Sequence, residues 1–291
     1  MKLVKRTEIN KPEIVYNLHI QNDHNYLANG AVVANCHGLK ADALQQLLTT
    51  VMAKIPIRWG LTGTIPKSKM DFMALKTAIG DVVHTVGAAE LQEIGVLSNL
   101  HIEIMQMQDN QEFGNYQTEL KFLMSNIQRM GHIAQIIADN ISKTGNTLVL
   151  VDRLEAGKLL QDCFEELNKT RTDKIDAIFI SGDTKSTDRV DQYDDMVLGG
   201  NKVLIATYGI AAVGLNILHV NNLVLIEPGK SFVRVIQSIG RGLRRSKDKD
   251  FVTVYDITST CKFAKRHLRE RKKYYDESQY PHSTKKINYK K

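Results

Sequence analysis

The second half of the chain alternates short apolar runs with longer amphipathic stretches. Apolar runs of this length predict buried strands, and they cover residues 147–151, 177–180, 202–206, 223–226 and 251–256. Between them, apolar residues recur at helical spacing in residues 153–168, 186–198 and 231–243. Strands that alternate with amphipathic helices favour a doubly wound parallel sheet. We therefore predict an α/β fold for this half of the chain.

The first part of the chain has a different pattern. Residues 1–35 alternate apolar and polar positions, as short strands do, and Asn29-Gly30 favours a two-residue hairpin turn. Beyond them the pattern predicts helices at 39–54 and 71–79, a buried strand that starts at residue 59, strand-like material at 96–108 and a long amphipathic helical stretch at 115–140. A small β segment is thus expected to precede mixed helices and strands.

Composition narrows the class of protein. The chain has 291 residues and is 43% apolar, which is enough for one large or two ordinary domains. No apolar run is long enough for a membrane span, and the N-terminus lacks the apolar core of a signal peptide. Three cysteines without metal-ligand spacing fit a reducing cytosol and predict no metal site. A net charge of +7 favours a polyanionic partner such as nucleic acid.

The clearest chemical signal of the second half is a pair of arginines in the string from Gln237 to Arg244. Arg241 and Arg244 lie three residues apart, so they share one face if the segment is helical. Two guanidinium groups that point the same way suit a triphosphate. A solvated basic face is the alternative, because more basic residues follow at 245–247.

This string, Gln-x-x-Gly-Arg-x-x-Arg, resembles motif VI of the superfamily 2 helicases, and neighbouring strings resemble other motifs of that family. Ala206-Thr207 with Gly214-Leu215-Asn216 is similar to motif V, and Leu61-Thr62-Gly63-Thr64 is similar to motif III. Residues 147–152 resemble motif IV, and residues 181–184 the motif after it. The resemblance implies RecA-like domains that bind ATP and nucleic acid.

The resemblance also implies roles for individual residues. Arg241 and Arg244 would contact the γ-phosphate, with Arg244 as the arginine finger. The other residues that it assigns to ATP binding and coupling are His37, Thr62, Thr64, Gly214, Gln237 and Gly240. Thr207 would contact a nucleic-acid phosphate.

Two parts of a helicase ATP site are missing from the sequence. Gly229-Lys230-Ser231 ends like a phosphate-binding loop, but Val224 stands where the first glycine of that loop is required. No other Gly-Lys-Ser/Thr string occurs, and neither does the acidic pair of an Asp-Glu-x-His box that would hold Mg²⁺. The chain by itself is therefore expected to lack ATPase activity.

The dipeptide Asn35-Cys36 suggests a reason for the missing parts. An asparagine side-chain amide can attack its own carbonyl and cut the chain, and a following cysteine thiol can accept an acyl group. With His24 and the Asn29-Gly30 turn upstream, residues 1–36 resemble the C-terminal piece of an intein. An ordinary loop dipeptide is the alternative.

Within this resemblance, His24 is implied as the proton-transfer group for the cyclisation of Asn35. Ala34 stands where the intein family often has His, which leaves that role to His24. Asn17 stands where the family usually has Asp. No cofactor is implied for splicing.

The position of Asn35-Cys36 connects the two resemblances. Cys36-His37 lies where motif II of a helicase is expected, ahead of the motif III string. If a partner fragment ended in Asp-Glu, ligation to Cys36-His37 would write Asp-Glu-Cys-His, as in the phage UvsW-type helicases, which residues 36 to about 260 resemble. Because the chain starts at Met1 with no intein N-terminal region, the intein is expected to be split and to act in trans. The ligated product would use ATP and Mg²⁺ on DNA.

The expected organisation has five segments. They are a split-intein C-terminal segment at 1–35, the end of a first RecA-like domain at 36–110, a helical linker at 111–145, a second RecA-like domain at 146–261 and a basic tail at 262–291. The tail, with Lys272 and Lys273 as candidate nucleic-acid contacts, is expected to be mobile at its end. The resemblance to phage helicases implies the cytoplasm of an infected bacterium, and roles in DNA repair or recombination.

Two rival interpretations stay open. The chain could be a nucleic-acid-binding module or degenerate helicase fragment that never splices, or an artificial fusion of these parts. The nucleic-acid substrate is open as well, between branched DNA and RNA–DNA hybrids, and so is the oligomeric state.

Overall fold

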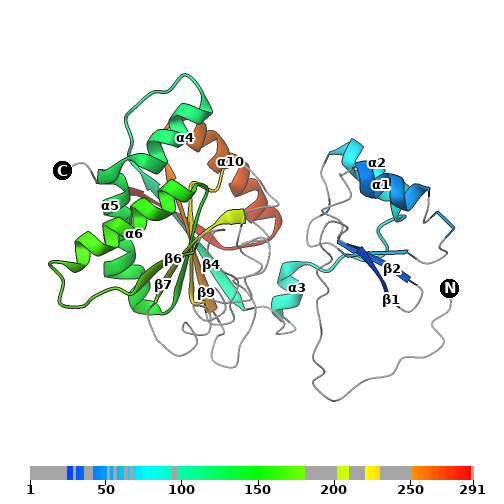
Figure 1. Cartoon of the computed structure of the whole chain (residues 1–291), viewed down its shortest axis with the longest axis horizontal. Helices are drawn as coiled ribbons and strands as arrows, with labels where there is room; N and C mark the ends of the chain where they lie inside the picture. The colour runs from blue at the N-terminus through cyan, green and yellow to red at the C-terminus, as the bar shows by residue number, and fades with distance from the viewer. Residues whose placement is uncertain are drawn as a thin grey trace, which may run out of the picture. The chain divides into compact units, whose positions relative to one another are not determined.

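The computed structural model describes residues 25–28, 31–35, 42–50, 53–54, 58–61, 65, 68–93, 98–180, 202–209, 220–229 and 251–289. The chain divides into two compact units, Met1–Thr85 and Val86–Lys291 (Figure 1). Within the described residues, no helix is long and apolar enough to cross a membrane. The predicted helices at 186–198 and 231–243 lie outside these residues.

The first unit contains a three-stranded sheet in the order β1-β2-β3. Its strands are β1 (Asn25–Ala28), β2 (Ala31–Asn35) and β3 (Arg58–Leu61), and its helices are α1 (Asp42–Thr49) and α2 (Lys69–Ala78). β1 and β2 are antiparallel, and Ala28 is paired with Ala31, which leaves two residues for the connection. The predicted two-residue hairpin is therefore confirmed. β2 continues the sheet by pairing with β3 in parallel.

The second unit is built on a seven-stranded sheet in which every paired strand is parallel, in the order β10-β4-β9-β8-β5-β7-β6. Its strands are β4 (Asn99–Met107), β5 (Thr147–Val151), β6 (Ala177–Ile180), β7 (Val203–Thr207), β8 (Asn222–Ile226), β9 (Phe251–Ser259) and β10 (His282–Ile287). This pairing confirms the predicted parallel sheet. Continuous apolar runs such as Thr147–Val151 are buried on both faces, as strands of a parallel sheet usually are.

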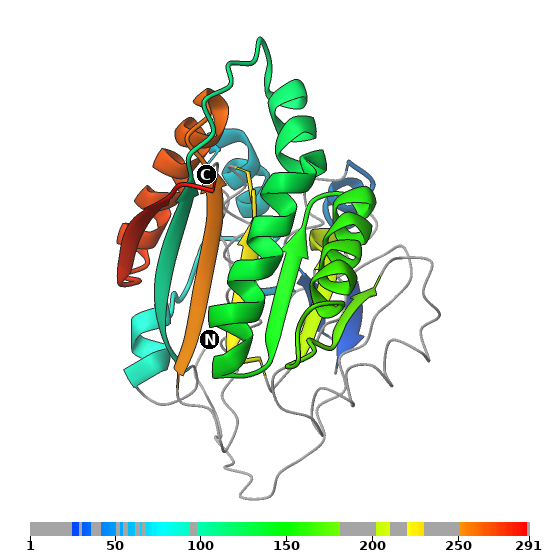
Figure 2. The same cartoon turned by 90° about the vertical axis from the view of Figure 1, so that its left-hand side faces the viewer.

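Helices cover both faces of this sheet (Figures 1 and 2). The helices and helical turns described in this unit are α3 (Ala88–Glu93), α4 (Tyr116–Ser125), α5 (Ile127–Ile136), the π-helical turn η2 (Ile137–Ile141), the 3-10 turn η3 (Ser142–Thr144), α6 (Leu154–Asn168) and α10 (Lys262–Glu277). Alternate residues of each strand face opposite cores: Leu148 and Leu150 share a cluster with Leu268 of α10, whereas Val149 shares one with Ile133 of α5.

One close approach holds α6 against the sheet. A Cβ atom built on Gly157 would lie 2.2 Å from the ring of Phe179 on β6. A side chain at this position would force the helix away from the strand, so the glycine sets the spacing between them.

Three features differ from the sequence-based expectation. The helical stretch expected at 115–140 is interrupted at Asn126, which ends α4 and accepts a hydrogen bond from the Arg129 backbone N–H to begin α5. β4 belongs to the sheet of the second unit, and the units divide between Thr85 and Val86 rather than near residue 110. The third difference concerns the C-terminal segment.

The basic C-terminal segment, which was expected to be mobile at its end, forms α10 and the edge strand β10 as far as Ile287. The buried carboxylate of Glu119 accepts hydrogen bonds from the backbone N–H groups of Phe263, at 3.0 Å, and Ala264, at 2.7 Å. These donors belong to the first turn of α10 and have no partner within the helix. Glu119 therefore caps α10 from another helix and fixes its start.

Candidate functional site

The carboxyl ends of the parallel strands place several polar residues along one edge of the second sheet. Thr207 ends β7 and is paired with Val151, the last residue of β5, which Asp152 follows. Glu227 directly follows β8 beside them. Ligands of open α/β sheets bind outside the carboxyl ends of the strands. This edge is therefore the candidate site.

A buried ion pair anchors the end of β8 at this edge. The Glu227 carboxylate lies 2.6 Å from a terminal nitrogen of Arg129, whose side chain is fully buried. The same guanidinium donates to the carbonyl of Leu123 at 3.0 Å, and Thr258 donates to the other carboxylate oxygen of Glu227 at 3.2 Å. The pair thus connects α5, β8 and β9.

A second buried carboxylate, Asp109, lies beside this pair. It accepts a hydrogen bond from the Ser259 hydroxyl at 2.7 Å and another from the phenol of Tyr289. Its carboxylate is 3.4 Å from the Nε atom of Arg129, which is an ion-pair distance, and that nitrogen makes no hydrogen bond. One guanidinium therefore faces two buried carboxylates, which ties residues after β4 and β10 to the carboxyl edge.

A second buried arginine supports the turn after Glu227. Arg271 of α10 forms a bidentate pair with Asp256 of β9, with both nitrogen–oxygen distances 2.8 Å. Its remaining terminal nitrogen donates to the carbonyl of Gly229 at 2.6 Å. The phenol of Tyr275 donates to Asp256 at 2.8 Å, and burial raises the pKa of that phenol. The rigid, planar guanidinium of Arg271, held by Asp256, fixes the carbonyl of Gly229 in place.

The backbone of this turn is in an uncommon conformation. Glu227 has a φ of 43° and Gly229 a φ of 70°, both in the left-handed region. A left-handed backbone is strained for a residue other than glycine and persists only where its surroundings hold it. The contacts of Arg129 and Arg271 supply that support. They define the direction in which the chain leaves β8.

The buried environment changes the proton affinity of Glu227. Burial raises the pKa of its carboxyl from 4.5 to about 7, and the positive charges of Arg129 and Arg271 oppose part of that rise. The carboxylates of Asp256 and Asp109 add to it. A carboxyl with this pKa takes up a proton near neutral pH in the folded protein and only near pH 4.5 in the unfolded chain.

The stability of the second unit is therefore expected to depend on pH through Glu227. Because the folded-state pKa lies above the unfolded value, its contribution is complete below pH 4.5 and is lost as the pH rises to about 7. Relative to Glu227→Gln, the free energy of unfolding should fall by about 3 kcal/mol across this range. Urea denaturation at a series of pH values measures it. Parallel curves for the two proteins would contradict the assignment.

Most residues that the sequence assigned to the site lie outside the described residues. They are His24, Cys36, His37, Thr62, Thr64, Gly214, Gln237, Gly240, Arg241 and Arg244. The structure places Asn35 at the end of β2 and half-buried Thr207 at the carboxyl end of β7. Thr207 is thus at the candidate edge.

Lys272 and Lys273 lie on α10 rather than in a mobile tail. Lys273 is exposed and 3.1 Å from Glu270, and Lys272 is half-buried. Further exposed basic residues of the same helix are Lys262, Lys265, Arg266 and Arg269. The helix therefore presents a row of cations on a rigid support, which a polyanion could contact.

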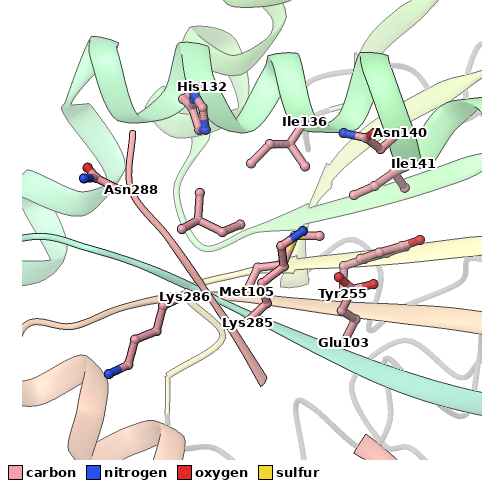
Figure 3. A pocket seen from close by; sticks show the side chains of 11 residues that line it. Glu103, Met105, His132, Ile136, Asn140, Ile141, Tyr255, Lys285, Lys286 and Asn288 are labelled. Carbon is pink, nitrogen blue, oxygen red and sulfur yellow. The ribbon is translucent and has the colours of Figure 1, made fainter. Parts of the chain in front are cut away.

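A cavity of about 480 Å³ lies elsewhere in the second unit (Figure 3). His132, Ile136 and Asn140 line it from α5 and η2, and Glu103 and Tyr255 from β4 and β9. Burial lowers the pKa of His132 and raises that of Tyr255. None of the residues that the sequence assigned to a site lines this cavity.

Among the described residues, no group of acidic, histidine or cysteine side chains could hold a metal ion.

Comparison with known proteins agrees with the fold of the second unit. Residues 128–246 match the model of the helicase conserved C-terminal domain. This segment has the fold of a helicase C-terminal domain. In the helicase domain, the predicted RecA-like fold is confirmed, and the strand end at Thr207 and the turn at Glu227 fall within the matched residues.

Individual relatives agree with this assignment. The chain is 24% identical to the ATP-dependent DNA helicase UvsW of Enterobacteria phage T4, with 82% of this chain and 47% of the relative covered. It therefore shows homology to superfamily 2 helicases of the UvsW kind. The chain spans about half the length of the curated relatives it matches.

Solved structures show the same fold. The crystal structure of T4 UvsW superimposes with a TM-score of 0.55 at 17% identity and covers 88% of this chain and 53% of that one. The ATP-dependent Type ISP restriction-modification enzyme LlaBIII, solved bound to DNA, gives a TM-score of 0.61 at 12% identity. The match covers 89% of this chain and 21% of that enzyme. Similarity at this level of identity concerns the fold of the helicase domain.

Sequence reasoning missed the buried charges that support the carboxyl edge. Arg129 and Arg271 look like members of amphipathic basic helices, and their burial depends on contacts distant in sequence. One local signal was available, because Glu227 and Asp256 each stand at an apolar strand of a parallel sheet. An acidic residue there requires a buried partner.

Proposed function

We propose that this chain is the C-terminal half of an ATP-dependent DNA helicase that becomes active only after protein trans-splicing. One observation carries the proposal: Asn35, which precedes Cys36 in the sequence, is the last residue of β2, and β2 runs parallel to β3, which ends at Leu61, the first residue of the motif III string. A splice junction at this position would join a partner fragment directly in front of Cys36-His37. The partner would supply the phosphate-binding loop and the Asp-Glu pair that the chain lacks.

The splicing chemistry assigns three residues of this chain. The partner fragment would arrive as a thioester at its own intein, and the thiolate of Cys36 would take over its acyl group. Asn35 would cyclise with His24 as the proton-transfer group and release residues 1–35. The amine of Cys36 would then attack the thioester and form the peptide bond.

In the ligated product this chain would supply the arginines of the ATP site. Arg241 and Arg244 would hold the γ-phosphate, Gln237 and Gly240 would orient them, and Arg244 would act as the finger. His37, Thr62, Thr64 and Gly214 would couple the nucleotide to the rest of the enzyme. Bound ATP with Mg²⁺ supplies the phosphoryl group that is hydrolysed.

Ligation in a mixture of the two fragments tests this proposal. This chain, combined with an N-terminal fragment that ends in Asp-Glu followed by an intein N-terminal half, should give a larger product and release residues 1–35 on a gel. Asn35→Ala should block release, whereas Asn10→Ala, in the same segment but outside the motif, should not. Absence of a ligated product, or identical behaviour of Asn35→Ala and the wild type, would refute splicing and leave a non-splicing nucleic-acid-binding fragment.

DNA binding is proposed to use Thr207 and the basic residues of α10. One relative is named as an ATP-dependent DNA helicase and comes from a phage, which supports DNA in the cytoplasm of an infected cell as the partner. Phosphate contacts by lysines release counterions, so the binding constant depends steeply on salt.

The double variant Lys272→Ala/Lys273→Ala is expected to bind DNA several-fold more weakly. The slope of log K against log salt should decrease by about 2, because each phosphate contact contributes about 0.9. Fluorescence anisotropy with a labelled oligonucleotide measures both values. The control Lys143→Ala/Lys174→Ala removes the same charge from exposed positions outside α10. An equal effect of the control would assign the loss to net charge alone.

A further inference from the structure

Tyr289 reaches the buried charges of the candidate edge although it lies beyond the last strand. Met107 of β4 is paired with Ile287 of β10, and the Gln108 N–H donates to the carbonyl of Ile287 at 2.8 Å. Because the two strands are parallel, the residues that follow this pair leave the sheet side by side. The phenol of half-buried Tyr289 donates to one oxygen of the Asp109 carboxylate.

The contact continues through one guanidinium to the turn after β8. The other carboxylate oxygen of Asp109 is 3.4 Å from the Nε atom of Arg129, and a terminal nitrogen of Arg129 is 2.6 Å from Glu227. Asp109, Arg129 and Glu227 are each at most 5% exposed. Buried polar groups depend on one another rather than on water. These three residues and Tyr289 therefore form one network, here called the Tyr289 network.

Two features of the Tyr289 network lower stability instead of raising it. The Nε atom of Arg129 makes no hydrogen bond with the described residues, although Asp109 is at ion-pair distance. Glu227 has a φ of 43°, in the left-handed region. Unsatisfied buried donors and strained backbone cost free energy, and strain of this kind is concentrated at functional sites. From this turn the chain continues to Gln237 and the two arginines assigned to the γ-phosphate.

We propose that Tyr289 is a positioning residue of the ATPase. Through the Tyr289 network it fixes Glu227, and with it the direction in which the chain leaves β8 toward the arginines of the ATP site. This inference rests on the proposed function, which supplies the reaction. The ion pair between Arg129 and Glu227 requires an ionised carboxylate, so kcat should rise with pH as Glu227 loses its proton.

The groups around Glu227 give the direction of the effect. They are Arg129 on α5, Arg271 on α10, Asp256 on β9 with its donor Tyr275, Asp109 after β4 and the thiol of Cys261. Burial and the hydrogen bond to Asp109 raise the pKa of the Tyr289 phenol, so it stays a donor at neutral pH. Without this donor, Asp109 attracts Arg129 more strongly and the pair of Arg129 with Glu227 weakens. The pKa of Glu227 should then rise above about 7.

Titration of Glu227 in the unligated chain tests the network without splicing. Tyr289→Phe keeps the ring and its contact with the ring of His132, whose centroid is 5.9 Å away. The midpoint of the Glu227 titration should move up by about one pH unit. Carbon-13 NMR of labelled glutamate measures the midpoint, and Glu227→Gln assigns the signal. Tyr280→Phe is the control, since it also removes a phenol hydroxyl from a ring that is 5% exposed but lies outside the network.

The ATPase of the ligated product tests the positioning role. In Tyr289→Phe, kcat at pH 7 should fall about fivefold, which is the loss of ionised Glu227 that a one-unit shift produces. Near pH 9 Glu227 is ionised again, and kcat should return to within about twofold of the wild type. Tyr280→Phe should keep the wild-type pH profile. A loss of kcat that is the same at every pH would indicate a structural role alone and would overturn the proposal.

The two measurements separate this inference from the proposed function. An unchanged Glu227 midpoint in Tyr289→Phe, or an equal shift in Tyr280→Phe, would overturn the inference while the ligated product remains an active ATPase. Absence of any ligated product, or a ligated product without ATPase activity, would instead refute the proposed function and with it the role of Tyr289 in the reaction.

Discussion

Arg244→Ala is expected to reduce kcat for ATP hydrolysis by the ligated, DNA-stimulated product about a thousandfold. An arginine that stabilises the charge on the transferred phosphoryl group contributes on the order of 10³ or more to the rate. Alanine keeps no donor at this position, and a neighbouring lysine cannot reproduce the planar fork. Steady-state ATPase assays with saturating DNA measure the effect, and the yield of ligated product should not change.

Arg245→Ala is the matched control for this prediction. It removes the same charge one residue further along the chain, outside the Gln-x-x-Gly-Arg-x-x-Arg string. Its kcat should stay within about twofold of the wild type, since Arg245 is not one of the two arginines assigned to the γ-phosphate. A comparable loss in both variants would assign the effect to the general basic character of residues 244–247. An active Arg244→Ala enzyme would remove Arg244 from the catalytic role.

Arg129→Met is expected to destabilise the helicase domain by about 3–5 kcal/mol, because it removes one partner of a buried ion pair. The fully buried guanidinium lies 2.6 Å from Glu227 and 3.4 Å from Asp109. Methionine fills part of the volume but leaves both carboxylates without their cation. Urea denaturation followed by far-ultraviolet circular dichroism measures the change in the unfolding free energy of this unit.

Arg171→Met provides the comparison at the surface. Arg171 also contacts two carboxylates, those of Asp139 and Asp173, but both of these are at least 39% exposed. The loss there should stay below about 1 kcal/mol. Adding Glu227→Gln to Arg129→Met should recover part of the stability, since the unpaired charge is then removed. A destabilisation of Arg129→Met no larger than that of Arg171→Met would show that the buried network does not stabilise the fold.

The candidate site was partly accessible from the sequence. Thr207 was assigned from a local string, and the structure places it at the carboxyl edge of the sheet. The Asn29-Gly30 hairpin followed from turn chemistry, which depends on neighbouring residues alone. The support of the edge by Arg129, Glu227 and Arg271 was not accessible, because the contacts join residues distant in sequence. Arg129 and Glu227 are 98 positions apart, and Arg271 and Gly229 are 42 apart.

The sequence by itself determined the apolar strands of the parallel sheet, the order of the helicase motifs and the position of Asn35-Cys36 among them. Such features depend on the local period of apolar residues and on short strings. Only the tertiary structure decided that β4 and β10 join the sheet of the second unit, that the basic C-terminal segment folds, and that β2 lies along β3. Period indicates which face of a strand is buried, whereas the choice of neighbour depends on packing between distant segments.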